Sequence, residues 1–93
     1  MPITPHVVRL VNIGPRSPQK DVEACAQQLA QLGIAAVPDV LQALRSEIEP
    51  QRQAAAKALL AIAGESFDYD PARDAAGNRD AVRRAELWYL RHR

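Results

Sequence analysis

The amino-acid sequence predicts an all-α protein, and three observations support that prediction. Alanine, the strongest helix former, accounts for 17 of the 93 residues, whereas only four residues are aromatic. Glycine and proline divide the chain into segments of helical length. Within several of these segments, apolar residues recur at intervals of three and four. A chain of this length usually forms one domain, so we expect residues 1–93 to share a single small core.

Residues 1–18 are expected to form an N-terminal extension or a short helix. Thr4-Pro5 has the composition of a helix start, and Gly14-Pro15 ends the apolar segment that follows. The β-branched residues of that segment also leave a strand open. They form a candidate docking surface for a partner: Val7, Val8, Val11 and Ile13.

Three helices are predicted between residues 17 and 64. Ser17-Pro18 and Gly33 bound the first, whose apolar stripe comprises Val22, Cys25, Ala26, Leu29 and Leu32. After the short link 34–36, a second helix is indicated by Val37, Val40, Leu41, Leu44 and Ile48. Such a short link makes these two helices antiparallel neighbours. Pro50 and Gly64 bound the third helix, whose apolar residues cover more than half its circumference, so we expect it to be central.

Residues 64–77 interrupt the helical pattern, and Asn78 is expected to cap a terminal helix over 78–92. We expect Phe67 and Tyr69 to pack, so that 64–77 forms a capping loop; an aromatic recognition pocket is the alternative. Residues 64–74 carry a charge of −3 and residues 78–93 carry +3, so the two segments are expected to pair. A calcium loop is a further alternative for Asp68, Asp70 and Asp74, although these lack the EF-hand spacing, glycine and final glutamate.

The helical pattern repeats with a period of about 30 residues. A shift of 30 superimposes the stripe Cys25, Ala26, Leu29 and Leu32 on Ala55, Ala56, Leu59 and Ile62. A shift of 31 superimposes Gly33 on Gly64. Periods of this size, built from helix pairs, are typical of α-solenoids.

The run ACAQQLAQLGIAAVPDVLQAL (residues 24–44) resembles the HEAT-repeat family, in particular the short bacterial phycobilisome-lyase-like form. QRQAAAKALLAIAG (51–64) is similar to the first helix of a following repeat. GESFDYDP (64–71), followed by a helix that contains tryptophan, resembles a C-terminal ending of many such proteins. The resemblance covers residues 20–93 and implies a short α-solenoid of about two HEAT-like hairpins, with four to five helices. It implies macromolecular recognition and no catalytic residue.

The terminal helix carries the candidate site. At about 100° per residue, Ala81, Val82, Ala85, Trp88 and Tyr89 form one arc, and two leucines lie opposite them among arginines. The candidate partner-binding residues are Arg83, Arg84, Leu87, Leu90 and Arg91; the alternative is that both leucines are simply exposed. A competing phosphate-binding set comprises Arg79, Arg83, Arg84 and Arg91.

No catalytic, cofactor or metal site is expected. Cys25 lies on an apolar stripe, which favours a buried thiol over a nucleophile. His6 and His92 lack acidic or cysteine neighbours at ligand spacing. We therefore expect a non-catalytic protein–protein interaction module, a small adaptor or accessory subunit that binds another protein or a second copy of itself. Nucleic-acid binding is the alternative, although the net charge is only +1. No apolar run approaches the roughly 18 residues that span a membrane, and a cytoplasmic location is expected.

Overall fold

The computed structural model describes residues 13–93, and every regular element within them is helical. These are α1 (Gln19–Leu32), the 3-10 helix η2 (Gly33–Ala36), α2 (Val37–Ala43), α3 (Glu49–Ala63) and α4 (Arg79–His92). The predicted all-α class is confirmed for this part of the chain. Of the expected N-terminal docking residues, Val7, Val8 and Val11 lie outside the described residues, whereas Ile13 is described and buried.

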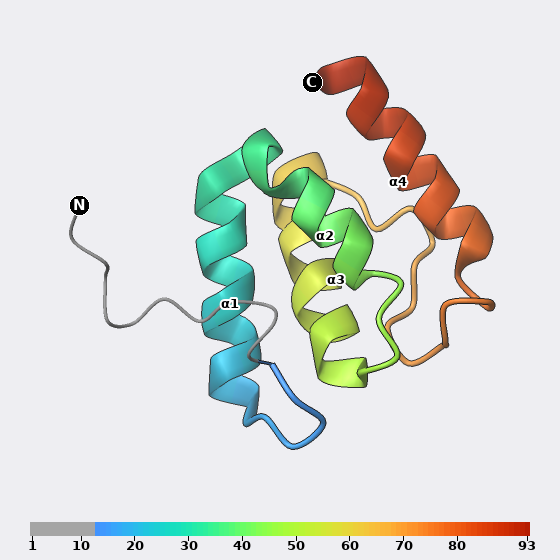
Figure 1. Ribbon diagram of the computed structural model, residues 1–93. Helices are drawn as coiled ribbons and strands as arrows, with labels where there is room; N and C mark the ends of the chain where they lie inside the picture. Colours follow the sequence, from blue (N-terminus) through green and yellow to red (C-terminus); the bar gives the residue numbers. More distant parts are fainter. Residues whose placement is uncertain (1–12) are drawn as a thin grey trace.

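The helices form a small globule in which α1 and α3 lie side by side and run in the same direction (Figure 1). Helix α2 returns in the opposite direction and packs against both α3 and α4. The segment 64–78 runs back down the molecule before α4 begins. The radius of gyration is 12.4 Å, close to the roughly 12 Å expected for a compact chain of this length.

The ends of α1 differ in part from the prediction. Pro18 is the N-cap residue and makes no side-chain cap; the Ser17 hydroxyl instead accepts a hydrogen bond from the Gly14 N–H at 2.8 Å. Gly33 ends the helix as expected, with a positive φ of 65° that glycine adopts without steric cost. The buried residues of the stripe are Val22, Cys25 and Ala26, whereas Leu29 is half-buried and Leu32, the last residue before η2, is 64% exposed.

Helix α2 is shorter than predicted, and Ile48 does not belong to its stripe. The helix ends at Ala43, and Ile48 is the N-cap residue of α3. The turn between them is held by Ser46, whose hydroxyl accepts from the Ile48 N–H at 3.0 Å and donates to the Gln51 side chain at 2.7 Å. These side-chain hydrogen bonds offer the backbone an alternative to continuing the helix.

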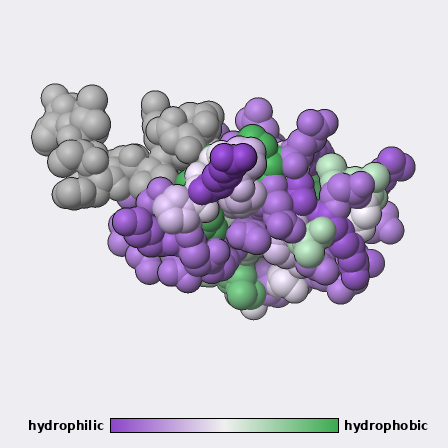
Figure 2. All heavy atoms as spheres, turned by 90° about the horizontal axis from the view of Figure 1, so that it is seen from below, coloured by the Kyte–Doolittle hydropathy of each residue, from purple (hydrophilic) through white to green (hydrophobic). Residues whose placement is uncertain are grey.

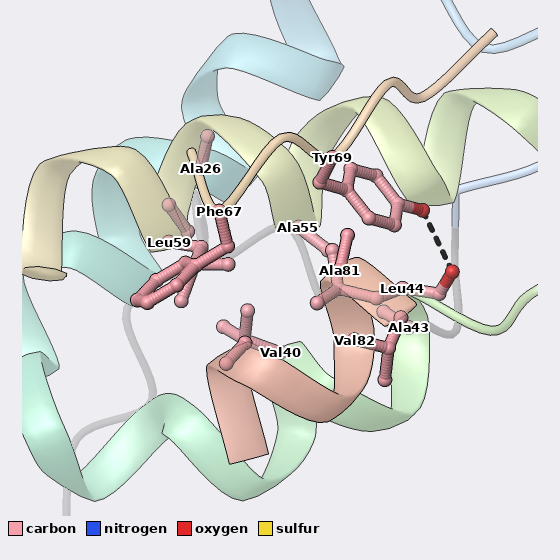
Figure 3. Close-up of a cluster of buried hydrophobic side chains, with 12 residues drawn as sticks. Ala26, Val40, Ala43, Leu44, Ala55, Leu59, Phe67, Tyr69, Ala81 and Val82 are labelled. Carbon is pink, nitrogen blue, oxygen red and sulfur yellow. Dashed lines mark hydrogen bonds between the residues drawn. The ribbon is translucent and has the colours of Figure 1, made fainter. Parts of the chain in front are cut away.

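Helix α3 is the central element, as its wide apolar surface predicted. Its alanines let neighbouring helices approach closely, and two cores meet on it. The smaller core comprises Ile13, Val22, Cys25 and Ala54. The larger core is shown in part in Figure 3 and comprises Ala26, Val40, Ala43, Leu44, Ala55, Ala58, Leu59, Phe67, Tyr69, Ala81, Val82 and Ala85. Neighbouring leucines mark the boundary, because Leu59 is 1% exposed and Leu60 is 51% exposed.

The two aromatic residues of the segment 64–77 are buried in the larger core, which confirms their expected packing (Figure 3). The Tyr69 hydroxyl donates to the Leu44 carbonyl oxygen at 2.6 Å. Phe67 and Asp68 have positive φ angles of 57° and 64°, a backbone region that costs a non-glycine residue roughly 1–2 kcal/mol. Burial of the Phe67 ring offsets that cost.

The predicted ion pairing between 64–74 and 78–93 is wrong. Within residues 13–93, Arg73 pairs with Asp70 of its own segment at 3.8 Å, and Glu86 of α4 pairs with Arg45 beyond the end of α2. The two segments are joined instead by neutral hydrogen bonds from Asn78 and by packing against Trp88.

Candidate functional site

The candidate site is an open cleft along the outer face of α4. Its volume is about 610 Å³. One wall is a stripe of α4, and the opposite wall consists of Arg45, beyond α2, and the turn at Ala75 and Ala76. The α4 residues that line it are Arg79, Val82, Arg83, Glu86, Leu87 and Leu90.

Helical spacing explains why α4 presents this stripe to solvent. Ala81, Val82 and Ala85 are buried in the larger core, and Trp88 packs partly against it. Leu87 and Leu90 project from another side of the helix and stay 47% and 56% exposed. The small alanine side chains bring α4 close to α2, so its remaining apolar residues lie at the edge of the contact.

Asn78 positions the N-terminus of α4 relative to the turn that forms the opposite wall. Its side chain is 1% exposed and points into the preceding segment, without capping the helix. The amide accepts from the Asp70 N–H at 3.0 Å and donates to the carbonyl oxygens of Asp70, Arg73 and Asp74 at 2.7, 3.1 and 3.2 Å. The expected capping role is therefore replaced by a set of longer-range hydrogen bonds.

Two of the three acidic residues proposed for a calcium loop, Asp70 and Asp74, hold turns of the chain. Asp70 Oδ1 accepts from the Ala72 N–H at 2.9 Å, and Asp74 Oδ1 accepts from the Gly77 N–H at 2.8 Å. In the part of the chain that the structure describes, no group of three or more His, Cys, Asp or Glu side chains is arranged to hold a metal ion. These carboxylates therefore shape the turn beside the cleft.

The opposite wall is fixed to α3 and to α4. Arg52 of α3 is 7% exposed and donates from Nε to the Pro71 carbonyl oxygen at 3.0 Å and from Nη1 to that of Ser46 at 2.8 Å. One buried guanidinium thereby joins the turn after α2 to the segment before α4. On the surface, Arg45 Nη2 contacts Glu86 Oε1 across the cleft.

The structure brings together some of the predicted site residues and separates others. Arg83, Leu87 and Leu90 line the cleft, and so does Arg79 of the competing phosphate-binding set. Arg84 and Arg91 are exposed and do not line it. At about 100° per residue, both lie on the adjacent face of α4.

Sequence reasoning missed the opposite wall of the cleft. Arg45 lies 41 residues from Glu86, and no local pattern connects them. The position of Glu86 in the cleft could have been predicted from the sequence. Glu86 follows Arg83 by three residues and Arg79 by seven, and it therefore shares their face of the helix. The turn at residues 75 and 76 required the path of segment 64–78.

Cys25 and His92 lie away from the cleft. Cys25 is fully buried, and desolvation raises the pKa of its thiol to about 11, which suppresses the reactive thiolate. His92 stacks on Trp88 with ring centroids 4.7 Å apart, and its Nδ1 donates to the Trp88 carbonyl oxygen at 2.8 Å. Trp88 in turn meets Phe67 edge-on at 6.2 Å, which attaches the end of α4 to the segment 64–77.

Comparison with known proteins gives no relative: no protein-family model, no curated protein and no solved structure matches this chain. Among the described helices, none is long and apolar enough to cross a membrane.

Proposed function

We propose that this chain is a non-catalytic protein–protein interaction module, a small adaptor or accessory subunit, and that it binds another protein through the α4 cleft. The observation that carries the proposal is the exposure of Leu87 and Leu90 in a cleft that also contains Arg79 and Arg83. Apolar anchors beside arginine are the combination enriched at the centres of protein interfaces.

The face of the molecule drawn in Figure 2 favours binding through a few anchor side chains and not through a broad hydrophobic contact. The face seen in Figure 2 is mostly hydrophilic, and its hydrophobic atoms form small, separate patches. On such a surface, a few buried side chains supply most of the binding energy, while the polar rim excludes water around them.

We further propose that α1, α2 and α3 correspond to one HEAT-like hairpin and the first helix of a second. The parallel course of α1 and α3, with α2 returning between them in sequence, supports this assignment (Figure 1). In this proposal, the irregular segment 64–78 takes the return path of the missing second helix, and α4 is an addition to the repeat. An incomplete stack leaves apolar surface for a partner.

Site-specific photo-crosslinking tests the proposed function. A benzophenone amino acid at position 87 is compared with the same residue at position 60, because Leu60 has matching exposure, 51% against 47%, and lies outside the cleft. In cells of the source organism, we expect a discrete protein adduct from position 87 and none from position 60. The adduct should disappear with Leu90→Asp and persist with Leu32→Asp.

Two outcomes would reject the proposal. One is the absence of any protein adduct specific to position 87. The other is an adduct that nuclease digestion removes, because this would support the competing set of arginines as a nucleic-acid site. An adduct of twice the mass of the chain would identify the partner as a second copy.

A further inference from the structure

The charge in the cleft is more positive than the charge of the whole chain. Three arginines and one glutamate line it, for a net charge of +2, whereas all 93 residues together carry +1. The rest of the molecule is therefore slightly negative. The cleft is therefore a local concentration of positive charge, which attracts the acidic side chains of a partner.

The apolar and charged side chains that α4 contributes to the cleft recur at helical spacing. The lining residues of α4 extend from position 79 to position 90 at spacings of three and four, a length of roughly 16 Å at 1.5 Å per residue. Leu87 and Leu90 occupy one end of this stripe, and Arg79 and Arg83 occupy the other. A partner that lies along it needs apolar side chains at one end and carboxylates at the other.

The walls of the cleft can contact a partner through side chains, but they contain no strand edge to which a partner could add by backbone hydrogen bonds. Among residues 13–93 there is no strand whose edge could pair with an extended peptide. An extended partner would find no strand edge with which to pair its own N–H and C=O groups. A helix satisfies these groups internally and presents side chains at intervals that match those of α4.

From this charge, length and wall structure, we propose that the cleft binds an acidic amphipathic helix of another protein. Apolar residues three or four positions apart pack on Leu87 and Leu90, and Asp or Glu residues of the same helix pair with Arg79, Arg83 and Arg45. This inference rests on the proposed function and specifies the partner that it leaves open.

In this proposal, Glu86 competes with the carboxylates of the partner for Arg45. It already pairs with Arg45 across the cleft, so a carboxylate from the partner has to displace it to reach that arginine. Neutralising Glu86 raises the charge of the cleft from +2 to +3 and frees Arg45. The substitution Glu86→Gln should therefore tighten the binding of an acidic helix, although it removes a contact from the folded chain.

The test uses three fluorescent 18-residue peptides, each held helical by a side-chain staple and each with the same leucine pair. Their polar face carries Glu, Gln or Lys, and fluorescence anisotropy measures binding to the full chain. We expect the Glu peptide to bind at least about tenfold more tightly than the Lys peptide in 50 mM salt, with a smaller ratio at 500 mM as the charges are screened.

Variants of the chain identify the surface. For the Glu peptide, we expect Arg83→Gln and Leu87→Asp each to weaken binding about three- to tenfold or more, and Glu86→Gln to strengthen it about threefold. Arg84→Gln and Leu60→Asp are the matched controls, since they remove an arginine and a leucine outside the cleft, and both should leave binding unchanged. Circular dichroism checks that each variant is folded.

The outcomes separate this inference from the proposed function. Equal binding of the three peptides, an equal loss with Arg84→Gln, or weaker binding with Glu86→Gln would overturn the acidic helix. If position 87 still crosslinks to a protein in that case, the proposed function stands with a different partner. Tight binding of a 20-nucleotide single strand that depends on Arg79 and Arg83 would overturn both.

Discussion

Asn78 could stabilise the protein either as the N-cap of α4 or through its hydrogen bonds to the segment before α4. The substitution Asn78→Asp separates these two roles. Asp and Asn are about equally good at the N-cap position, and a negative charge at a helix N-terminus contributes roughly 0.3–1 kcal/mol of stability. If Asn78 served only as a cap, the substitution would be neutral or slightly stabilising.

The hydrogen bonds of Asn78 predict the opposite sign. Aspartate keeps the acceptor for the Asp70 N–H but loses both amide N–H groups, which donate to three carbonyl oxygens. Each lost hydrogen bond contributes roughly 0.5–1.5 kcal/mol, and the new carboxylate faces carbonyl oxygens at a site that is 1% exposed. We therefore expect Asn78→Asp to lower the free energy of unfolding by at least about 2 kcal/mol, or roughly 8–16 °C in Tm for a domain of this size.

Urea denaturation measures this change. Far-UV circular dichroism reports the helices, and fluorescence of Trp88, the single tryptophan, reports the contact between α4 and Phe67. Asp80→Asn is the control, because Asp80 is an exposed acid in the first turn of α4 and its loss should cost no more than about 1 kcal/mol. A free energy of unfolding for Asn78→Asp within about 0.5 kcal/mol of the wild type would refute the tertiary role.

Three further predictions follow from the core. Tyr69→Phe removes the hydrogen bond to the Leu44 carbonyl oxygen and should lower the free energy of unfolding by about 1 kcal/mol in urea titrations at pH 7. Burial raises the pKa of Tyr69 from 10.0 to about 12, so the wild type should lose stability between pH 10 and pH 12, and Tyr69→Phe should lose less over the same interval; equal losses would contradict the assignment. Leu59→Ala should cost about 2–5 kcal/mol in thermal or urea unfolding and Leu60→Ala less than about 0.5 kcal/mol, because their side chains are 1% and 51% exposed; similar costs would contradict the packing of α3. Cys25 should react with a disulfide reagent at pH 8 only as the chain unfolds, so that urea accelerates labelling; rapid labelling of the native protein would contradict its burial.

Several elements were predictable because their determinants lie within a few residues. Gly33 and Gly64 end α1 and α3 through positive φ angles that other residues rarely adopt. Pro50 lies in the first turn of α3, where its missing N–H has no helical partner to lose. The buried arc of α4 followed from the spacing of Ala81 and Ala85, because helical geometry alone decides which side chains share a face.

Other features depended on residues distant in the sequence. The stripe of α1 predicted a buried Leu32, but in the folded chain this side chain is 64% exposed. Arg52 lies on an alanine-rich helix and is buried because carbonyl groups from two separate turns surround its guanidinium. The opposite charges of 64–74 and 78–93 predicted ion pairs between these two segments. In the structure, Arg73 pairs within its own segment and Glu86 pairs with Arg45.

For the candidate site, one wall could be predicted from the sequence alone. Helical periodicity placed Arg79, Arg83, Leu87 and Leu90 on one side of the terminal helix, because the angle between residues is set by backbone hydrogen bonding. The same periodicity places Arg84 and Arg91 on the adjacent face, whereas the opposite wall, formed by Arg45 and the turn at 75–76, depends on the folded arrangement of distant segments. Packing of side chains from separated segments sets those positions, and no interval along the chain encodes them.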